Sequence, residues 1–230
     1  GNVIGSRGSV IPFFKEKSGQ GKIPVTNIEM TRFIISLREC VDFVWQSFEQ
    51  MIGGEIFVKK IPSIKIVDIA NAISGKAMAR GSRYHYLQED FLNNKLTEER
   101  LKEITPLDLM MFNQTKELTS RLGDIYMLEG SMYSNDLEMA GRVDLIAEFA
   151  GKVSVIDFKT STKRKSPSKI KGYFMQETAY ALMFEEMYGV SINRIVTIIA
   201  VEETGQSQMF VEEPSKWIEP LKELRTQYRQ

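Results

Sequence analysis

GRVDLIAEFAGKVSVIDFKT, residues 141–160, has the pattern of two short strands, rich in Val, Ile and Phe, that meet at Ala150-Gly151. A symmetric two-residue loop predicts that Ile146 lies opposite Val155 and that Asp144 lies opposite Asp157. Lys159 projects to the same side as Asp157, because side chains alternate along a strand. A bulged three-residue turn is the alternative, and it would separate the two aspartates.

Two carboxylates and one ammonium group therefore share a patch in the predicted hairpin. Like charges this close repel each other unless a cation lies between them. Mg²⁺ suits such a site, because it prefers a few carboxylate oxygens together with water and phosphate. The alternative is a solvated strand face, since an Asp-x-Lys pair by itself is common.

Composition sets further bounds on function. The 230 residues suffice for one large or two small domains, and the formal net charge is zero, so no global basic field indicates a nucleic-acid partner. One cysteine, Cys40, excludes an internal disulfide framework. No apolar run is long enough to span a membrane and no signal peptide is visible, so a cytoplasmic protein is expected. The chain starts in what has the pattern of a strand, which indicates that Gly1 is not a native initiation site.

Residues 1–74 alternate strand and helix patterns. The predicted strands are Asn2–Ile4, Ile23–Thr26, Thr31–Ile35 and Glu55–Lys59, and the predicted helices are Val10–Lys17, Ser36–Met51 and Val67–Ser74.

The motifs GNVIGSRGSVIPFF, MTRF, GGEIFV and KIPSIKIVDIA resemble the C-terminal half of the inverting UDP-N-acetylglucosamine 4,6-dehydratases, which are extended short-chain dehydrogenases. The resemblance implies that Asn2, Arg7 and Arg32 lie on motifs that line a sugar-nucleotide pocket. No G-x-G-x-x-G motif is present, so no nicotinamide cofactor is expected. An inactive remnant of the dehydratase is favoured over a working sugar-nucleotide site.

From Ser74–Lys76 onward the pattern changes to that of a second domain, residues 75–230. A long helix carries His85 and Glu89 on one face. Further helices are predicted at Thr97–Glu103, Pro106–Leu122, Tyr173–Tyr188 and Pro214–Tyr228, and further strands at Tyr126–Asn135, Arg194–Val201 and Gln208–Val211.

Four motifs in this second part, R-G-S-R-Y-H-x-x-x-E, G-R-V-D, V-I-D-F-K-T and Q-x-x-x-Y, resemble the RecB-like PD-(D/E)XK nucleases. The likeness is greatest to phage exonucleases related to the mitochondrial genome maintenance exonuclease. It implies an α+β (mixed α/β) fold with a restriction-endonuclease-like core, preceded by a partial dehydrogenase substrate-domain fragment. One departure from the family is that the first acid stands in G-R-V-D rather than in P-D.

The resemblance also implies roles for individual residues. Asp144, Asp157, the Phe158 carbonyl and His85 would hold Mg²⁺ or Mn²⁺, and Lys159 would activate water and stabilise charge on the phosphate. Gln176 and Tyr180 would position the strand or support Lys159. Nucleic-acid contacts are expected from an aromatic pair and a basic loop: Tyr84, Tyr173, Lys163, Arg164, Lys165, Lys169 and Lys171. Phe174 is a further candidate for stacking on bases.

The function predicted from the sequence is a metal-dependent DNA exonuclease that acts on single strands or DNA ends, preceded by an inactive dehydratase fragment. Two alternatives stay open. One is a protein derived from a UDP-N-acetylglucosamine dehydratase that still binds sugar nucleotides, and the other is a non-catalytic nucleic-acid-binding module.

Overall fold

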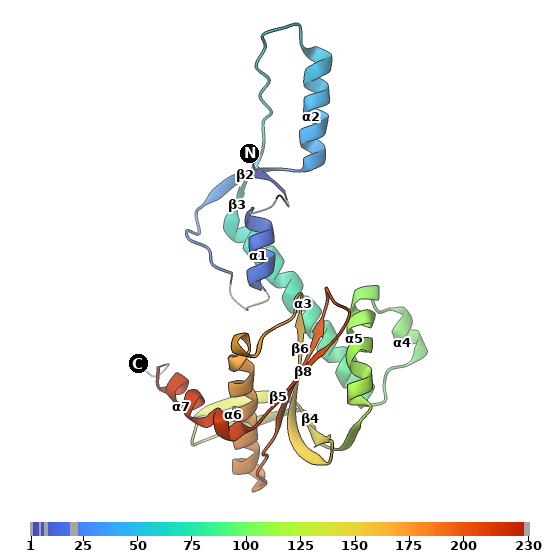
Figure 1. The fold of residues 1–230 in the computed structure, drawn as a ribbon, viewed down its shortest axis with the longest axis vertical. Coiled ribbons are helices and arrows are strands. Elements are labelled where there is room, and N and C mark those ends of the chain that lie inside the picture. The colour runs from blue at the N-terminus through green and yellow to red at the C-terminus, as the bar shows by residue number, and fades with distance from the viewer. Residues whose placement is uncertain (1, 5, 7–8, 19–22, 228–230) are drawn as a thin grey trace. The chain divides into compact units, whose positions relative to one another are not determined.

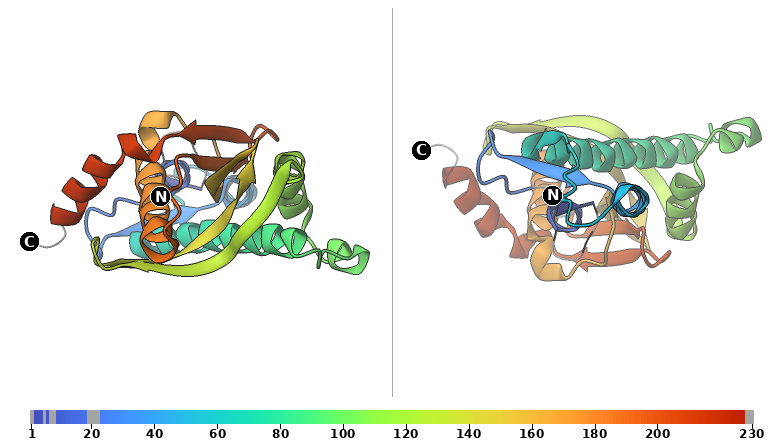
Figure 2. Two further views of the ribbon diagram at one scale, coloured as in Figure 1. Left: turned by 90° about the horizontal axis from the view of Figure 1, so that it is seen from below. Right: turned by 90° about the horizontal axis from the view of Figure 1, so that it is seen from above.

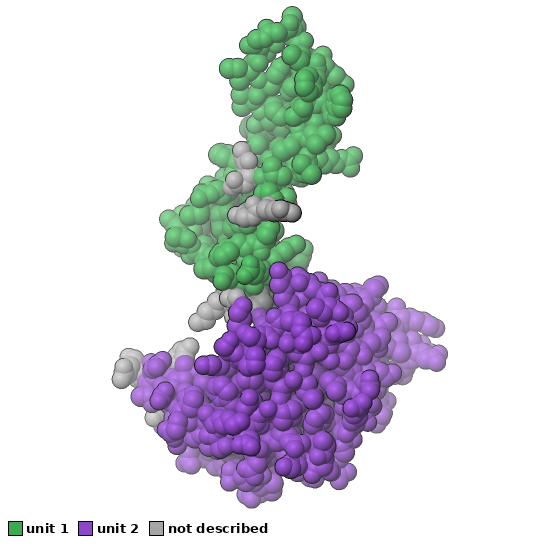
Figure 3. All heavy atoms as spheres, viewed as in Figure 1, with its two compact units in different colours: residues 1–79 green, residues 80–230 purple. Residues whose placement is uncertain are grey.

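The computed structural model describes residues 2–4, 6, 9–18 and 23–227. The chain divides into two compact units, residues 1–79 and 80–230 (Figure 3). Helix α3, Ile66–Leu92, begins in the first unit and ends in the second. No helix among the described residues is long and apolar enough to cross a membrane.

Unit 1 combines a small sheet with helices. The sheet has the order β1-β2-β3, in which β1 runs parallel and β3 antiparallel to β2. The strands are Asn2–Val3, Thr31–Ile35 and Ser63–Lys65, and the complete helices are α1, Val10–Ser18, and α2, Leu37–Gln50. The buried core is small and centres on Phe14, Ile66 and Ala70.

Helix α2 begins at a capping box. The Ser36 hydroxyl accepts a hydrogen bond from the Glu39 backbone N–H, and the Glu39 carboxylate accepts one from the Ser36 N–H. Such reciprocal bonds satisfy N–H groups that lack partners in the first turn. The helix then ends before Gly53-Gly54, and it buries none of its residues.

Several predictions for unit 1 are wrong. Ile23–Thr26 and Glu55–Lys59 are not strands, because neither segment has a pairing partner among the described residues. The short helix predicted at Val67–Ser74 is the start of α3, which continues through Gly75 and Gly81. Glycine lowers helix stability by only about 1 kcal/mol, which neighbouring turns can offset. Arg7 and the Asn2 side chain lie outside the described residues.

Unit 2 is built on a five-stranded mixed sheet of order β4-β5-β6-β7-β8, in which only β6 and β7 are parallel. The strands are Leu122–Ser134, Met139–Phe149, Lys152–Ser161, Ile195–Val201 and Gln208–Glu212. The helices that follow the end of α3 are α4, Glu98–Lys102; α5, Pro106–Thr119; α6, Lys171–Tyr188; and α7, Ile218–Gln227. The predicted mixed α/β class is confirmed.

Helices cover both faces of this sheet (Figures 1 and 2). On one face α6 packs against residues such as Ile146, Val155 and Ile199. On the other face Tyr84 of α3 and Met111 of α5 pack against residues that include Ile156 and Ile198. Every residue of β7 is buried, as expected for a central strand covered on both sides.

The predicted hairpin register is confirmed for the pairs Phe149–Lys152 and Ile146–Val155. Ala150 and Gly151 both have positive φ, +49° and +74°. Two such residues form the turn whose twist matches an antiparallel strand pair, so no bulge shifts the register.

Candidate functional site

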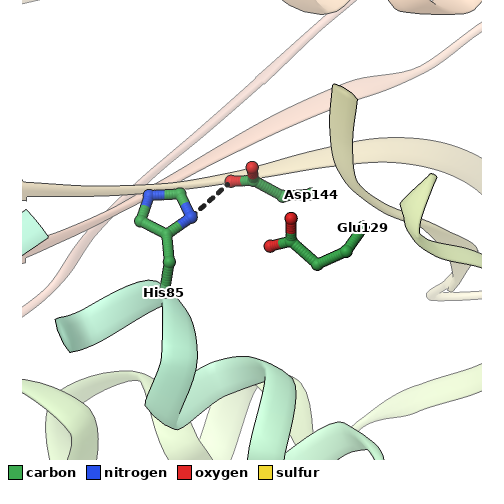
Figure 4. Close-up of side chains that lie close together, drawn as sticks. All are labelled: His85, Glu129 and Asp144. Atoms are coloured by element: carbon green, nitrogen blue, oxygen red, sulfur yellow. Dashed lines mark ion pairs between the residues drawn. The ribbon is translucent and has the colours of Figure 1, made fainter. Parts of the chain in front are cut away.

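Three potential metal ligands meet on the β4-β5 side of unit 2. Ligand atoms of His85, Glu129 and Asp144 all lie within 4.8 Å of one another. His85 comes from α3, Glu129 from β4 and Asp144 from β5. Their side chains converge on one point (Figure 4). One imidazole and two carboxylates from three elements therefore form the densest group of cation ligands in the described residues.

Asp144 is fixed by two contacts. Its Oδ2 accepts a hydrogen bond of 2.8 Å from the Phe158 backbone N–H, and the same oxygen lies 3.3 Å from Nδ1 of His85. Burial raises the pKa of Asp144, but the interaction with His85 outweighs it, so the pKa falls below its usual value. Burial lowers the pKa of His85, and the interaction with Asp144 reverses that to a net rise. The pair therefore favours a charged imidazolium beside a carboxylate.

Asp157 and Lys159 lie deeper in the protein. The Asp157 side chain is 2% exposed and forms an ion pair with the Lys159 ammonium, yet neither of its oxygens accepts a hydrogen bond among the described residues. Burial is the main reason why the pKa of Asp157 is raised. Lys159 also lies 5.4 Å from the centre of the Tyr173 ring. Burial lowers the pKa of Lys159, but the negative charges of Asp157 and Asp144 raise it by more, so the net shift of the pKa is upward.

Glu129 is a member of the cluster that the sequence analysis missed. It lies in β4 between the register pairs Leu128–Leu145 and Gly130–Val143, and its φ is +51°. Its carboxylate is 2.8 Å from the Arg142 guanidinium. Burial and the neighbouring Asp144 raise the pKa of Glu129. A positive φ at a non-glycine residue inside a strand is a strained geometry of the kind found at functional sites.

Glu177 is a second residue that the sequence analysis missed. It projects from α6 and is fully buried, and its Oε1 accepts a 2.5 Å hydrogen bond from the Thr197 hydroxyl of β7. Burial, followed by the charge of Asp157, raises the pKa of Glu177 well above its usual value. Its other oxygen has no partner among the described residues. The sequence signal was a Glu at helical spacing from the inward-facing Phe174 and Ala181 of the same helix.

The predicted pair Gln176 and Tyr180 is in contact. The Gln176 side-chain amide donates a 3.1 Å hydrogen bond to the Tyr180 hydroxyl oxygen. The Tyr180 ring lies against Gly141, where a Cβ atom would come within 2.7 Å of it. Gly141 therefore allows α6 to approach β5, the strand that carries Asp144, closely.

The predicted nucleic-acid contacts are not brought together. Tyr84 is fully buried and its hydroxyl donates to the Thr115 hydroxyl, and Phe174 is 1% exposed, so neither ring can stack on an external base. Tyr173 is half-buried beside Lys159. The basic residues follow β6 in and around the 3-10 turn Pro167–Lys169: Lys163, Arg164 and Lys169 are exposed, as is Lys171 at the start of α6, whereas Lys165 is half-buried.

The cluster can hold a cation and move a proton. Imidazole and carboxylate donors within this range suit a transition-metal ion with open positions for other ligands. The buried Asp157 carboxylate lies near this cluster and is paired with the Lys159 ammonium. Lys159 supplies a held positive charge beside them.

Unit 1 has a separate feature, an open hollow of about 360 Å³. It is lined by Phe33 in the middle of β2 and by Lys59, Lys60 and Ile61 of the extended segment that follows α2. The Lys59 ammonium donates to the Glu39 backbone carbonyl at 3.3 Å. Two lysines and an aromatic residue in the lining suit an anion that is attached to a flat or cyclic group.

Comparison with known proteins points first to a class of proteins that act in polysaccharide biosynthesis. The family described as polysaccharide biosynthesis protein matches residues 1–103. This match covers all of unit 1 and the first 24 residues of unit 2.

Two relatives from Campylobacter jejuni subsp. jejuni make the likeness specific. The inverting UDP-N-acetylglucosamine 4,6-dehydratase of serotype O:2 is 57% identical over 76 residues, 32% of this chain and 23% of that protein. The enzyme of the same name from serotype O:23/36 is 37% identical over 155 residues, 66% of this chain and 42% of that protein. The chain thus spans less than half the length of these relatives. A crystal structure of SSO0001 aligns over 67% of this chain and 72% of its own, with 15% identity and a TM-score of 0.32, which carries no conclusion about the fold.

These findings confirm the dehydratase resemblance and correct the predicted function. A DNA exonuclease is wrong, because the relatives and the matching family belong to sugar-nucleotide and polysaccharide chemistry. Mg²⁺ or Mn²⁺ as a nuclease cofactor, and DNA as the partner, are wrong for the same reason. The expected absence of a nicotinamide cofactor is also overturned, because it was inferred from the missing G-x-G-x-x-G motif in a chain that spans only part of such an enzyme. The nuclease likeness misled because Asp and Lys on adjacent strands serve many kinds of site.

Proposed function

We propose that this chain acts in nucleotide-sugar chemistry, as a dehydratase-like protein, and that unit 1 contributes to the binding of a nucleoside diphosphate sugar. The observation that carries the proposal is the 57% identity over 76 residues to an inverting UDP-N-acetylglucosamine 4,6-dehydratase. The hollow lined by Phe33, Lys59 and Lys60 supports it. Two ammonium groups match a diphosphate, and the ring offers a surface for the base or the sugar.

Calorimetric titration of UDP-N-acetylglucosamine into the whole chain tests this proposal. We expect saturable binding that weakens about tenfold or more when Lys59 and Lys60 are both changed to Ala, because charge-assisted hydrogen bonds are lost. The matched control changes Lys15 and Lys17 of α1 to Ala, which removes the same charge away from the hollow. Absence of binding heat, or equal loss in both double variants, would remove the proposal.

A second candidate function rests on unit 2. We propose that His85, Glu129 and Asp144 form a site for a transition-metal ion such as Zn²⁺ or Co²⁺, to which the predicted ligands Asp157 and the Phe158 carbonyl would add. Lys159 holds a positive charge beside the site, and Gln176 and Tyr180 support the elements that carry it. The observation in its favour is the convergence of His85, Glu129 and Asp144 within 4.8 Å. A bound ion of this kind lowers the pKa of a coordinated water. Around this site, a restriction-endonuclease-like core stays a prediction for unit 2, supported by its mixed sheet with helices on both faces.

Addition of Co²⁺ to the whole chain tests the metal site without any assay of activity. We expect a visible absorption band and a concentration-dependent rise in melting temperature, because an ion that binds only the folded state stabilises it. Both signals should be lost in His85→Ala and kept in Asp124→Asn, which changes an exposed carboxylate of β4. Equal responses in the two variants would contradict the site.

A further inference from the structure

Glu129 is the member of the cation cluster whose position regular structure explains least. Its φ of +51° lies in the left-handed region, although the residue stands inside a strand. Within the described strands β4 and β5, the register continues on either side but omits the pair Glu129–Asp144. Such a backbone persists only where its surroundings hold it. Some contact must therefore fix Glu129 in this geometry.

The other two ligands of the cluster have evident supports. Asp144 accepts a 2.8 Å hydrogen bond from the Phe158 backbone N–H. His85 follows Tyr84, which is fully buried and donates to the Thr115 hydroxyl, so this turn of α3 is anchored in the core. Metal ligands are generally oriented by partners of this kind, which are not ligands themselves. Glu129 needs a corresponding partner.

Arg142 of β5 contacts both polar parts of Glu129. Its Nε–H donates a 3.0 Å hydrogen bond to the Glu129 backbone carbonyl, and the same nitrogen lies 2.8 Å from the Glu129 carboxylate. Arg142 precedes Asp144 by two residues, so both side chains leave the same face of the sheet. It stands diagonal to Glu129, a separation that a long side chain can span. One guanidinium group thus fixes both the backbone and the carboxylate of Glu129.

An ordinary surface ion pair would not have this consequence. The Arg142 side chain is 59% exposed, and ion pairs at such positions contribute little because water and salt screen them. The bond to the carbonyl differs, because it reaches the backbone of a residue with positive φ, whose side chain is turned toward the cluster (Figure 4). Without this bond the backbone would relax toward an extended conformation. The direction of the Glu129 Cα–Cβ bond would then change, and with it the position of the carboxylate.

We propose that Arg142 is a positioning residue for the cation cluster of His85, Glu129 and Asp144, because it holds Glu129 in the left-handed conformation that brings its carboxylate to the other two ligands. The inference rests on the second proposed function, the transition-metal site of unit 2. Arg142 is not a ligand itself, since a charged guanidinium group donates hydrogen bonds but accepts none. It acts through Glu129.

Two neutral variants of similar length separate the hydrogen bond from the charge. Arg142→Gln places an amide N–H donor at the same distance along the side chain as Nε of arginine, whereas Arg142→Met has no donor. Titration of the whole chain with Co²⁺, followed by visible absorption, should show an affinity about 10–100-fold lower for Arg142→Met, the usual effect of losing a partner that orients a ligand. Arg142→Gln should recover most of this loss.

The absorption spectrum of bound Co²⁺ shows whether Arg142 acts through Glu129. The band of Arg142→Met should match that of Glu129→Ala, because both sites lack the same carboxylate, and the band of Arg142→Gln should match that of the wild type. The double variant of Arg142→Met and Glu129→Ala should bind no more weakly than Glu129→Ala alone, because the effects of coupled residues do not add.

Arg121→Met is the matched control. The Arg121 side chain is 65% exposed and forms an ion pair with Glu117 of α5 rather than with a member of the cluster. This variant should leave both the affinity for Co²⁺ and the absorption band unchanged. Circular dichroism checks that each variant is folded, and Arg142→Ala, which also lacks a donor, replaces Arg142→Met if the latter does not fold.

The outcomes separate this inference from the proposed metal site. Equal affinities of Arg142→Gln and Arg142→Met, wild-type affinity in Arg142→Met, or tighter binding by both variants would overturn the role of Arg142 and leave the metal site in place. Absence of a Co²⁺ band in the wild-type chain would remove the metal site, and the positioning role with it.

Discussion

At the scale of single residues, Glu129 combines a strained backbone with a place in the cation cluster. A non-glycine residue in the left-handed region costs roughly 1–2 kcal/mol, and glycine avoids this cost. In an ordinary strand the alanine variant is the more stable of the two, because glycine lowers the stability of a strand by about 0.5–1 kcal/mol relative to alanine. Comparison of Glu129→Gly with Glu129→Ala therefore isolates the strain at φ +51°, since both variants remove the same carboxylate.

We expect Glu129→Gly to melt about 2–4 °C above Glu129→Ala, as roughly 1 kcal/mol predicts for a chain of this size. Both variants should bind Co²⁺ more weakly than the wild type. Thermal unfolding followed by circular dichroism measures the first effect. An alanine variant as stable as the glycine variant would show that the backbone at Glu129 is not strained.

Asp108 makes stability dependent on pH. Its buried carboxylate accepts hydrogen bonds from the Arg83 guanidinium at 2.6 Å and from the Thr105 hydroxyl at 2.8 Å. Burial raises the pKa of Asp108, but the bonds from Arg83 and Thr105 outweigh it, so the pKa is lowered in the folded state. Because the pKa is lowered by folding, the ionised carboxylate stabilises the protein fully at pH values above the pKa of Asp108 in the unfolded chain, which is near 4. This stabilisation is lost as the pH falls through the pKa of Asp108 in the folded protein.

Asp108→Asn should consequently lower the free energy of unfolding by about 1–3 kcal/mol at neutral pH. The difference from the wild type should shrink as the pH falls below about 4. Urea unfolding across this pH range measures both effects, with the exposed Asp124→Asn as the control. A difference that stays constant down to low pH would mean that the carboxylate charge is not what stabilises this site.

At the scale of elements, the contact between β5 and α6 depends on Gly141. A Cβ atom there would lie 2.7 Å from the Tyr180 ring, so Gly141→Ala must displace a nearly buried side chain. We expect a loss of about 1–3 kcal/mol. Gly172→Ala is the control, because nothing lies within 4 Å of its Cβ and α6 should gain up to about 1 kcal/mol. Similar denaturation midpoints for the two variants would contradict this account of the contact.

The elements also show how far sequence reasoning extends. The hairpin register followed from Ala150-Gly151, because a tight turn leaves only one alignment of its strands. The Glu55–Lys59 pattern failed because alternation indicates an extended segment but not whether a partner strand exists. In the cluster, Asp144 and His85 lie within recognisable sequence motifs. Glu129 reaches the cluster through a backbone geometry that the local sequence does not indicate. The predicted exonuclease function was wrong because one patch of charged residues can serve several kinds of chemistry.

At the scale of the whole molecule, the two units differ in the size of their cores. Among the residues that the structure describes, unit 1 has one small buried cluster around Phe14, whereas the sheet of unit 2 is packed on both faces. Regions with few buried apolar contacts open with lower free energy. The exposed segment after α2 contains Lys59-Lys60 and has neither helix nor strand.

Limited digestion with trypsin should therefore cut first at Lys59 or Lys60 and leave a resistant product that contains residues 80–230. Mass spectrometry of the early products identifies the site. Hydrogen exchange should agree, with slow exchange in β6 and β7 and fast exchange in residues 51–62. First cleavage in the Lys163–Lys171 loop would show that unit 2 is the less protected part.

The buried central strand has a consequence for the newly made chain. Ile195–Val201, IVTIIAV, carries no charge and no proline, and it is rich in β-branched residues. A segment of this kind aggregates readily when it is exposed. It pairs in parallel with β6 across the crossover through α6, so after synthesis it stays exposed until α6 has packed. During that delay, the flanking charges of Arg194 and Glu202 act as gatekeepers against intermolecular strand pairing, and later they form contacts with the Phe149 carbonyl and with Arg80.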